Sequence, residues 1–274
     1  TRRAPQFRAA LRACARRTQQ KLITSSPVSQ ERASKFSGPG TYDAACAEDV
    51  MAIMADPGVK DFLKDPETSL DLDDNAHFFL AKADKIGEPS YLPTDEDILK
   101  VRDPTRTIET LDFKFNKAHF RVIDVGGQRM ERPKWNLTGE ITAVIFVCAL
   151  TEYNQVLRED IKQNRLKESL NLFDIACNRR YPDKPIILFL NKVDLFVEKI
   201  KEVDLKVCFP TYKGGCNYDE ALEYIRFRFR NVRKDKAREL EIHETTATDS
   251  KNAKVVFDAV FDIVEKQNLN DSGF

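Results

Sequence analysis

The chain has 274 residues, of which 42% are hydrophobic, and its 44 basic and 44 acidic residues give a formal net charge of zero. This is a globular rather than a disordered composition, and the balanced charge gives no reason to expect nucleic acid or an anionic membrane as partner. Six cysteines occur without a C-x-x-C pair, which indicates a reduced, intracellular protein. The longest apolar run, Ala143–Leu150, is too short to span a bilayer, which takes ~20 residues.

Residues 1–40 differ in composition from the rest of the chain. The charged residues before the first acid, Glu31, are all cations, from Arg2 to Lys21. An arginine-rich, acid-free leader is typical of an organelle transit peptide, and a disordered basic arm is the alternative. Residues 24–41 are rich in Ser, Pro and Gly, as in a linker. We predict that residues 1–40 form a basic, disordered segment.

Residues 41–100 have a helical pattern. Asn75–Ile86 places apolar residues on one face and stops before Gly87, and Asp95–Val101 follows Pro93 as another short helix. We predict a small all-helical domain, of which residues 41–100 are a part.

From residue 101 onward, strands alternate with helices. The predicted strands are Leu111–Phe115, His119–Val125, Ala143–Leu150, Pro185–Leu190 and Glu241–Thr245, and the predicted helices are Gln155–Cys177, Tyr218–Arg233 and Asn252–Lys266. Continuous apolar runs among these strands are typical of a parallel sheet buried on both faces. The alternation predicts a doubly wound α/β domain, in which ligands bind beyond the carboxyl ends of the strands.

The segment DVGGQ follows a predicted strand directly. Asp124 is placed to hold Mg²⁺, Gly127 to let a backbone N–H approach a phosphate, and Gln128 to orient a water for in-line attack. A turn with a capping aspartate is the alternative explanation of this pattern.

Two further polar segments follow predicted strands. In Asn191-Lys192-Val193-Asp194, the carboxylate of Asp194 is suited to accept two hydrogen bonds from guanine, and a helix N-cap is the alternative. In Thr246-Ala247-Thr248, small side chains leave room for a backbone N–H to reach the guanine O6. The order of the three segments predicts one guanine-nucleotide pocket.

From about residue 56 to 274, the chain resembles the α subunit of a heterotrimeric G protein, most of all its Gi-like branch. The resemblance lies in YLPTDEDILKVRDPTRT, DVGGQRMERPKW, FLNKVDLF, TATDSKN and FDAVFDIVEKQNL. It implies a Ras-like doubly wound P-loop NTPase fold with a small all-helical domain, and residues 101–274 would be the Ras-like GTPase domain.

The resemblance also implies a function: a molecular switch that binds GTP and GDP with Mg²⁺ and hydrolyses GTP. Arg102 and Gln128 would be catalytic, and Thr105 and Asp124 would hold the metal. The implied nucleotide-binding residues are Leu99, Arg102, Thr105, Gly127, Asn191, Lys192, Asp194, Ala247 and Thr248. Arg106-Thr107 departs from the family pattern, which has Thr-Gly at these positions.

The implied partners are a βγ dimer, a G-protein-coupled receptor, an effector enzyme such as adenylyl cyclase, and regulators of hydrolysis, at the inner face of the plasma membrane. Arg129, Glu131, Lys134 and Trp135 would lie on the second-switch helix, which Pro133 could break. Residues 158–160 would form the third switch. The tail, residues 270–274, would meet the receptor, and Ser272 in place of a modifiable cysteine argues against ADP-ribosylation.

One part of the family pattern is missing from the sequence. None of the ten glycines begins a P-loop, G-x-x-x-x-G-K-[ST]. The resemblance places the P-loop after an N-terminal strand that lies between the strands ending at Val125 and Leu150. We therefore predict a sheet without that strand, and weak nucleotide binding. The alternative function is a nucleotide-impaired decoy that binds receptor or βγ. A small monomeric GTPase is a third hypothesis.

Overall fold

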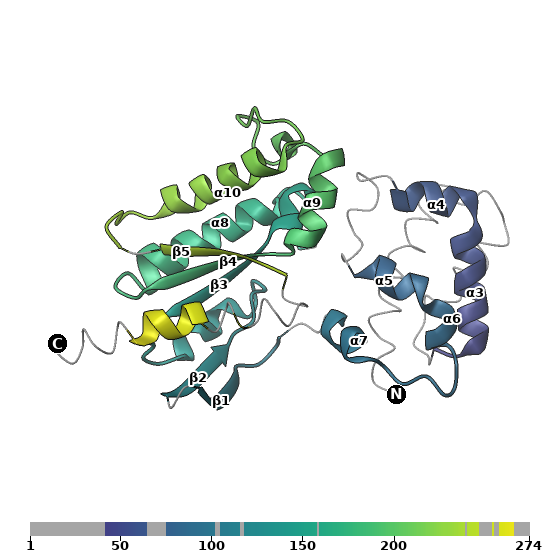
Figure 1. Cartoon of the computed structure of the whole chain (residues 1–274), viewed down its shortest axis with the longest axis horizontal. Coiled ribbons are helices and arrows are strands. Elements are labelled where there is room, and N and C mark those ends of the chain that lie inside the picture. The colour runs from purple at the N-terminus through teal and green to yellow at the C-terminus, as the bar shows by residue number, and fades with distance from the viewer. Residues whose placement is uncertain are drawn as a thin grey trace.

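The computed structural model describes residues 42–64, 75–101, 105–115, 118–157, 159–238, 240–246, 254 and 258–265. Figure 1 shows a group of short helices beside an α/β part, with helix α7 between them. The predicted basic segment, residues 1–40, lies outside the described residues. Within the part that is described, no helix is both long enough and apolar enough to cross a membrane.

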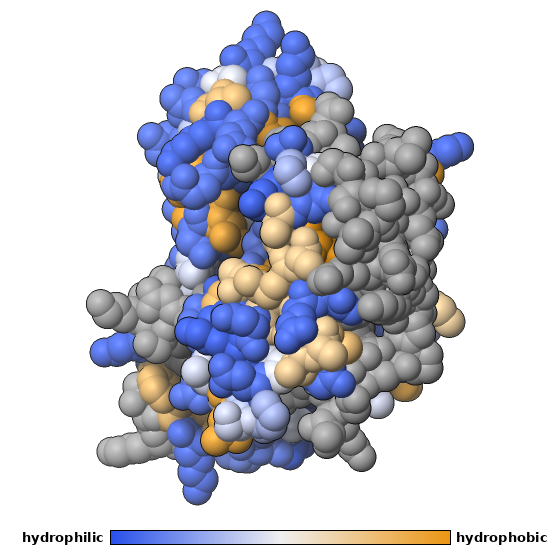
Figure 2. Space-filling model, turned by 90° about the vertical axis from the view of Figure 1, so that its right-hand side faces the viewer, coloured by the Kyte–Doolittle hydropathy of each residue, from blue (hydrophilic) through white to orange (hydrophobic). Residues whose placement is uncertain are grey.

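The helical part has a small core of its own. Its helices are α3 (Ala44–Ala55), α4 (Pro57–Lys64), α5 (Ala76–Ala81), α6 (Ala83–Ile86) and α7 (Asp95–Lys100). Val50, Ile53 and Leu80 are buried and pack against one another. Among the described residues on the side that carries these helices, hydrophilic residues predominate around smaller hydrophobic patches (Figure 2). The predicted helix Asn75–Ile86 is present, but it is divided into α5 and α6.

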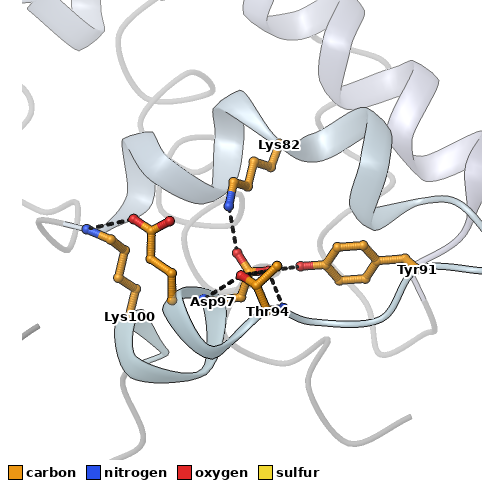
Figure 3. A network of polar contacts seen from close by, with 6 residues as sticks. Lys82, Tyr91, Thr94, Asp97 and Lys100 are labelled. Atoms are coloured by element: carbon orange, nitrogen blue, oxygen red, sulfur yellow. Dashed lines mark hydrogen bonds and ion pairs between the residues drawn. The ribbon is translucent and has the colours of Figure 1, made fainter. Parts of the chain in front are cut away.

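Helix α7 is attached through a buried carboxylate, Asp97 (Figure 3). This carboxylate accepts hydrogen bonds from Lys82 Nζ at 2.9 Å and Tyr91 Oη at 2.7 Å. It also accepts two from Thr94, through the backbone N–H and the hydroxyl, each at 2.8 Å. Thr94 in turn accepts from the Asp97 N–H, so the two residues form a capping box at the start of α7.

The strands form two separate sheets. The first is an antiparallel hairpin of β1 (Glu109–Phe115) and β2 (Ala118–Asp124). The second is parallel, in the order β3 (Val144–Ala149), β4 (Ile186–Asn191) and β5 (Leu240–Thr245). Among the described residues, no strand pairs with the second edge of β2 or the outer edge of β3. The N-terminal strand of the family pattern would lie between these two edges.

Helices cover both faces of the parallel sheet, as predicted. Ile186, Leu188 and Leu190 of β4 belong to the main core, together with residues of α8 (Arg165–Ile175), α9 (Val193–Glu202) and α10 (Tyr218–Val232). Ile187 and Phe189 face the opposite side and pack against the C-terminal helix, residues 258–265. Figure 1 shows this helix on the face opposite to α8 and α10. The α/β class is thus confirmed.

The C-terminal helix also holds the two sheets together. Its Phe261 ring lies 5.9 Å from the ring of Phe115 and 6.1 Å from that of Phe120, both in the hairpin. Ile263 of the same helix packs on β4. The hairpin and the parallel sheet are therefore joined through a shared helix.

Two sequence predictions were wrong. β3 is not buried on both faces, because Ile145 is 40% and Val147 58% exposed; β3 is an edge strand among the described residues, and the C-terminal helix packs over β4 instead. The predicted helix Gln155–Cys177 begins only at Arg165. Asn164 caps it by accepting from the Lys167 N–H, and the preceding residues turn back through a bridge between Val156 and Asn164.

The described residues also contain short helices that are not α-helical. They are 3₁₀ helices at Arg132–Leu137, Leu150–Asn154 and Leu205–Val207, and a π-helical turn at Ala176–Arg180 that continues α8.

Candidate functional site

The two residues predicted to hold Mg²⁺ lie against each other. The Thr105 hydroxyl donates to Asp124 Oδ2 at 3.2 Å, although the residues are 19 positions apart. Asp124 is the last residue of β2, and the pairing of Glu109 with Asp124 brings the chain before β1 to this strand end. The topology of the hairpin therefore places the predicted first switch beside the predicted second switch.

Gly126 allows this close approach. A Cβ atom at this position would lie 2.5 Å from the backbone oxygen of Thr105 and 2.7 Å from the Glu131 Cβ, so no larger residue fits without displacing the backbone. Gly127 has open space around it, and both it and Gln128 are exposed. The turn thus packs its first glycine inward and presents the predicted phosphate-sensing glycine and the predicted water-orienting glutamine outward.

The predicted second-switch helix is a single 3₁₀ helix, Arg132–Leu137, with Pro133 in its first turn. Proline suits a helix start because it lacks the N–H that would be unpaired there. Lys134 makes short contacts with the Glu131 carboxylate and with the backbone oxygen of Arg106. The predicted second-switch residues therefore also contact the backbone of the predicted first switch.

Arginines join this segment to its neighbours. Arg132 pairs with the largely buried Glu168 of α8 at 2.8 Å, and Arg129 pairs with Asp160 of the predicted third switch at 3.4 Å. Trp135 donates from its indole N–H to the Gly126 oxygen at 2.9 Å. These bonds connect the predicted second-switch residues to the turn, to α8 and to the predicted third switch.

The two segments predicted to recognise guanine also meet. Asn191 ends β4 and lies in register with Thr245, the last residue of β5, whose hydroxyl donates to Asn191 Oδ1 at 3.3 Å. Asp194, in the first turn of α9, accepts from the Thr246 hydroxyl at 3.2 Å and is otherwise exposed. Both contacts lie at the carboxyl ends of parallel strands, where ligands bind in this architecture.

Lys192, between these residues, has an unusual backbone conformation. Its φ is +65° and its ψ +39°, in the left-handed region, which a non-glycine residue adopts at a cost of about 1 kcal/mol or more. Such strain concentrates at functional sites. The left-handed conformation of Lys192 ends β4 and lets α9 begin at Val193, so that Asp194 lies in the first turn of the helix.

The remaining predicted site residues are not brought to the same place by anything that the structure describes. Leu99 lies in α7 and is 60% exposed. Arg102, Arg158, Ala247, Thr248 and residues 266–274 lie outside the described residues. Two residues that the structure adds are Gly126 and Thr246; each stands next to a predicted residue, but nothing in the sequence indicates the atom that it contacts.

The donor set at the first two switches suits magnesium. Thr105 and Asp124 supply a hydroxyl and a carboxylate oxygen, and Mg²⁺ prefers a few such hard ligands, completed by water and phosphate oxygens. The described residues contain no group of three or more His, Cys, Asp or Glu side chains that could enclose a metal. The residues present therefore fit an ion held jointly with a phosphate ligand.

Comparisons with known proteins agree with these features. The sequence model of the family described as "G-protein alpha subunit" matches residues 6–264. The chain is 45% identical over 225 residues to the "Guanine nucleotide-binding protein alpha-2 subunit" of Dictyostelium discoideum, covering 82% of this chain and 63% of the relative. It is 44% identical over 233 residues to the "Guanine nucleotide-binding protein G(o) subunit alpha" of Lymnaea stagnalis and of Planorbella trivolvis, covering 83% of this chain and 66% of each relative. The chain thus spans just under two thirds of the length of these relatives.

Proposed function

Because the chain belongs to the family of G-protein alpha subunits, we propose that it is a guanine-nucleotide switch that binds GTP and hydrolyses it to GDP and phosphate. In this proposal residues 41–100 contribute to a helical domain and residues 101–274 form the GTPase domain. The observation that carries the proposal is the meeting of Asp194 with Thr246 at the ends of β4 and β5. It joins the two guanine-recognition segments, which are 52 residues apart.

The chemistry of this contact favours guanine over adenine. An exposed carboxylate at position 194 accepts two hydrogen bonds from the N1–H and the exocyclic amine of guanine. Adenine offers no such pair of donors, so its binding would cover the carboxylate without pairing it, and burial of an unpaired charged group costs about 1–3 kcal/mol or more. The backbone of residues 247 and 248 would bind the guanine oxygen, and Lys192 would cover the base.

Hydrolysis would take place at the other end of the nucleotide. Thr105 and Asp124 would hold Mg²⁺, which neutralises phosphate charge when it is bound. Gln128, exposed at the turn, would orient the attacking water, and the Gly127 N–H would bind the transferred phosphate. Arg102 would stabilise developing charge, an effect worth roughly 10³- to 10⁵-fold in rate.

The partners proposed are a βγ dimer, a receptor, an effector such as adenylyl cyclase, and regulators of hydrolysis, at the inner face of the plasma membrane. The exposed apolar side chains of the second switch support this proposal: Met130 is 86% and Leu137 73% exposed. Apolar side chains in that position suit a protein interface.

A second candidate is a nucleotide-impaired α-like module that binds receptor or βγ. The absence of a P-loop pattern from the sequence favours it, since that loop supplies the phosphate-binding amides and lysine. The edges of β2 and β3 that no described strand covers agree with this candidate. In that case receptor or βγ binding would not depend on nucleotide.

Binding of fluorescent GDP and GTP by the full chain separates the two candidates. Asp194→Ala is expected to weaken guanine-nucleotide binding at least tenfold, and excess ATP is expected not to compete. The control is Glu198→Ala, on the same helix, whose exposed side chain pairs with Lys201 of that helix. Failure of the unmodified chain to bind either nucleotide, together with βγ capture in its absence, would favour the second candidate.

A further inference from the structure

Helix α8 ends in a π-helical turn, Ala176–Arg180. The N–H of Tyr181 donates to the Ala176 oxygen at 2.9 Å, five residues back. In an α-helix it would donate to the oxygen of Cys177. Single π turns are rare and recur at functional sites. This one frees the Cys177 oxygen for a partner outside the helix.

That partner is Arg238, which precedes β5. Its Nη1 donates to the Cys177 oxygen at 2.9 Å and to the Tyr181 oxygen at 2.9 Å. In the α register the Cys177 oxygen would also accept from the Tyr181 N–H, so the π register leaves this oxygen more open to Arg238. Arg238 thus bonds to two of the oxygens that lie beyond the π turn's own hydrogen bond.

A second residue ties the turn to the same loop. Asn178 donates to the Val232 oxygen at 2.9 Å and accepts from the Lys234 N–H at 2.9 Å. We call residues 230–238 the basic loop, because they carry five cations and one acid. Burial, followed by the nearby Arg238 charge, lowers the pKa of Arg233.

On its other side the π turn holds the second switch. Arg180 Nη2 donates to the Trp135 oxygen at 2.8 Å, and the Tyr181 hydroxyl lies 3.1 Å from the Thr138 hydroxyl. Trp135 in turn donates to the Gly126 oxygen at 2.9 Å. A continuous series of side-chain to backbone hydrogen bonds thus runs from the basic loop to the turn at Gly126.

We propose that the π turn couples the basic loop to the second switch, with Arg238 fixing the π register and Arg180 acting as the positioning residue for Trp135. A shift to the α register would rotate residue 180 about the helix axis and release the Trp135 oxygen. The inference rests on the proposed function only in naming the Gly126 turn as part of the nucleotide site. Coupling between two sites is reciprocal, so each end reports changes at the other.

The test uses amide hydrogen exchange and iodide quenching of Trp135, the only tryptophan, in the full chain without nucleotide. Arg238→Ala is expected to speed exchange of residues 132–138 about tenfold, the factor that ~1.4 kcal/mol of lost stabilisation gives, and to increase quenching. Arg238→Lys, which keeps a donor, is expected to restore part of the effect. Reciprocally, Arg180→Ala is expected to speed exchange of residues 232–238.

Two controls separate coupling from general destabilisation. Lys236→Ala changes the same loop. Among the described residues the Lys236 amine donates to the oxygens of Arg230 and Asn231, within that loop. Residues 132–138 are therefore expected to be unaffected. Exchange in β4 reports global stability and is expected to stay constant; Asn178→Ala replaces Arg238→Ala if the latter unfolds the chain. Effects confined to the mutated side would overturn the proposal. The exchange test uses no nucleotide. If coupling were observed in a chain that failed to bind GTP, this inference would stand and the proposed function would be wrong.

Discussion

The attachment of α7 through Asp97 gives a quantitative prediction. The Asp97 side chain is 3% exposed and accepts four hydrogen bonds, one from the Lys82 ammonium. Replacement by alanine removes all four and leaves the Thr94 N–H without its partner. Helix α7 also loses its capping box, and this helix leads directly to the predicted first switch.

The magnitude follows from the contacts. A hydrogen bond to a charged group contributes about 1.5–3 kcal/mol, and loss of a cap about 1 kcal/mol, but such terms are not additive. Lys82 is 30% exposed and regains water when its partner is lost, which reduces the cost. We expect Asp97→Ala to lower the free energy of unfolding of the helical part by about 3 kcal/mol. Lys82→Met is expected to cost about 1 kcal/mol, because three donors to Asp97 remain.

Urea denaturation, together with amide exchange of residues 76–100, measures both effects. Asp95→Ala is the matched control, since Asp95 is exposed in the same helix, and a change within ~0.5 kcal/mol is expected. If Asp97→Ala and Asp95→Ala had equal effects, the reasoning from burial and hydrogen bonding would be refuted.

The pH dependence is a second readout for the same variant. Burial alone would raise the pKa of Asp97, but its hydrogen bonds, led by that from Lys82, lower the pKa well below its usual value. A carboxylate with a lowered folded pKa contributes stability above its unfolded pKa of ~3.9 and loses it as pH falls toward the folded value. The difference between the unmodified chain and Asp97→Ala should be constant above pH ~5 and shrink below pH ~4. A difference that stayed constant in acid would contradict the assignment.

Two further predictions concern other parts of the chain. Gly126→Ala is expected to displace the segment that carries Thr105 and to weaken Mg²⁺-dependent nucleotide binding at least tenfold. Gly127 has open space around it, so Gly127→Ala is expected to change the free energy of unfolding by less than ~0.5 kcal/mol. If the two variants lost the same amount of stability, the packing argument would be contradicted. Burial raises the pKa of the Cys208 thiol to about 12, so at pH 8 mass-spectrometric mapping of alkylation should find the exposed Cys216 modified and Cys208 protected until the chain unfolds.

Local chemistry indicated which strand ends could lie close together. The segments after β2 and β4 each join an apolar run to polar residues, and in the structure Asp124 and Asp194 contact Thr105 and Thr246 of the segments predicted to share their site. The sequence could not indicate Gly126 or Thr246 as contact residues. Their roles depend on a backbone oxygen and a carboxylate that are distant in the chain, and no local pattern encodes such a distance.

The predicted helix boundaries were wrong where a side chain competes with the backbone for hydrogen bonds. The apolar pattern from Gln155 to Cys177 continues through Asn164, but an asparagine side chain that accepts from the Lys167 N–H starts the helix later. At the other end the pattern gives no sign of the π turn, whose Cys177 oxygen is bonded by Arg238, 61 residues further along the chain.

The burial of β3 depends on its neighbours in the same way. Its sequence is as continuously apolar as that of β4, and periodicity alone assigns both to a buried sheet. β4 has a hydrogen-bonded strand on each side and helices on both faces, whereas β3 pairs only with β4 among the described residues, and Ile145 and Val147 stay exposed. Exposed apolar side chains on an unpaired edge are a liability that folded proteins normally cover. The composition of β3 therefore suits a strand with a partner on its second edge, the place that the family pattern gives to the N-terminal strand.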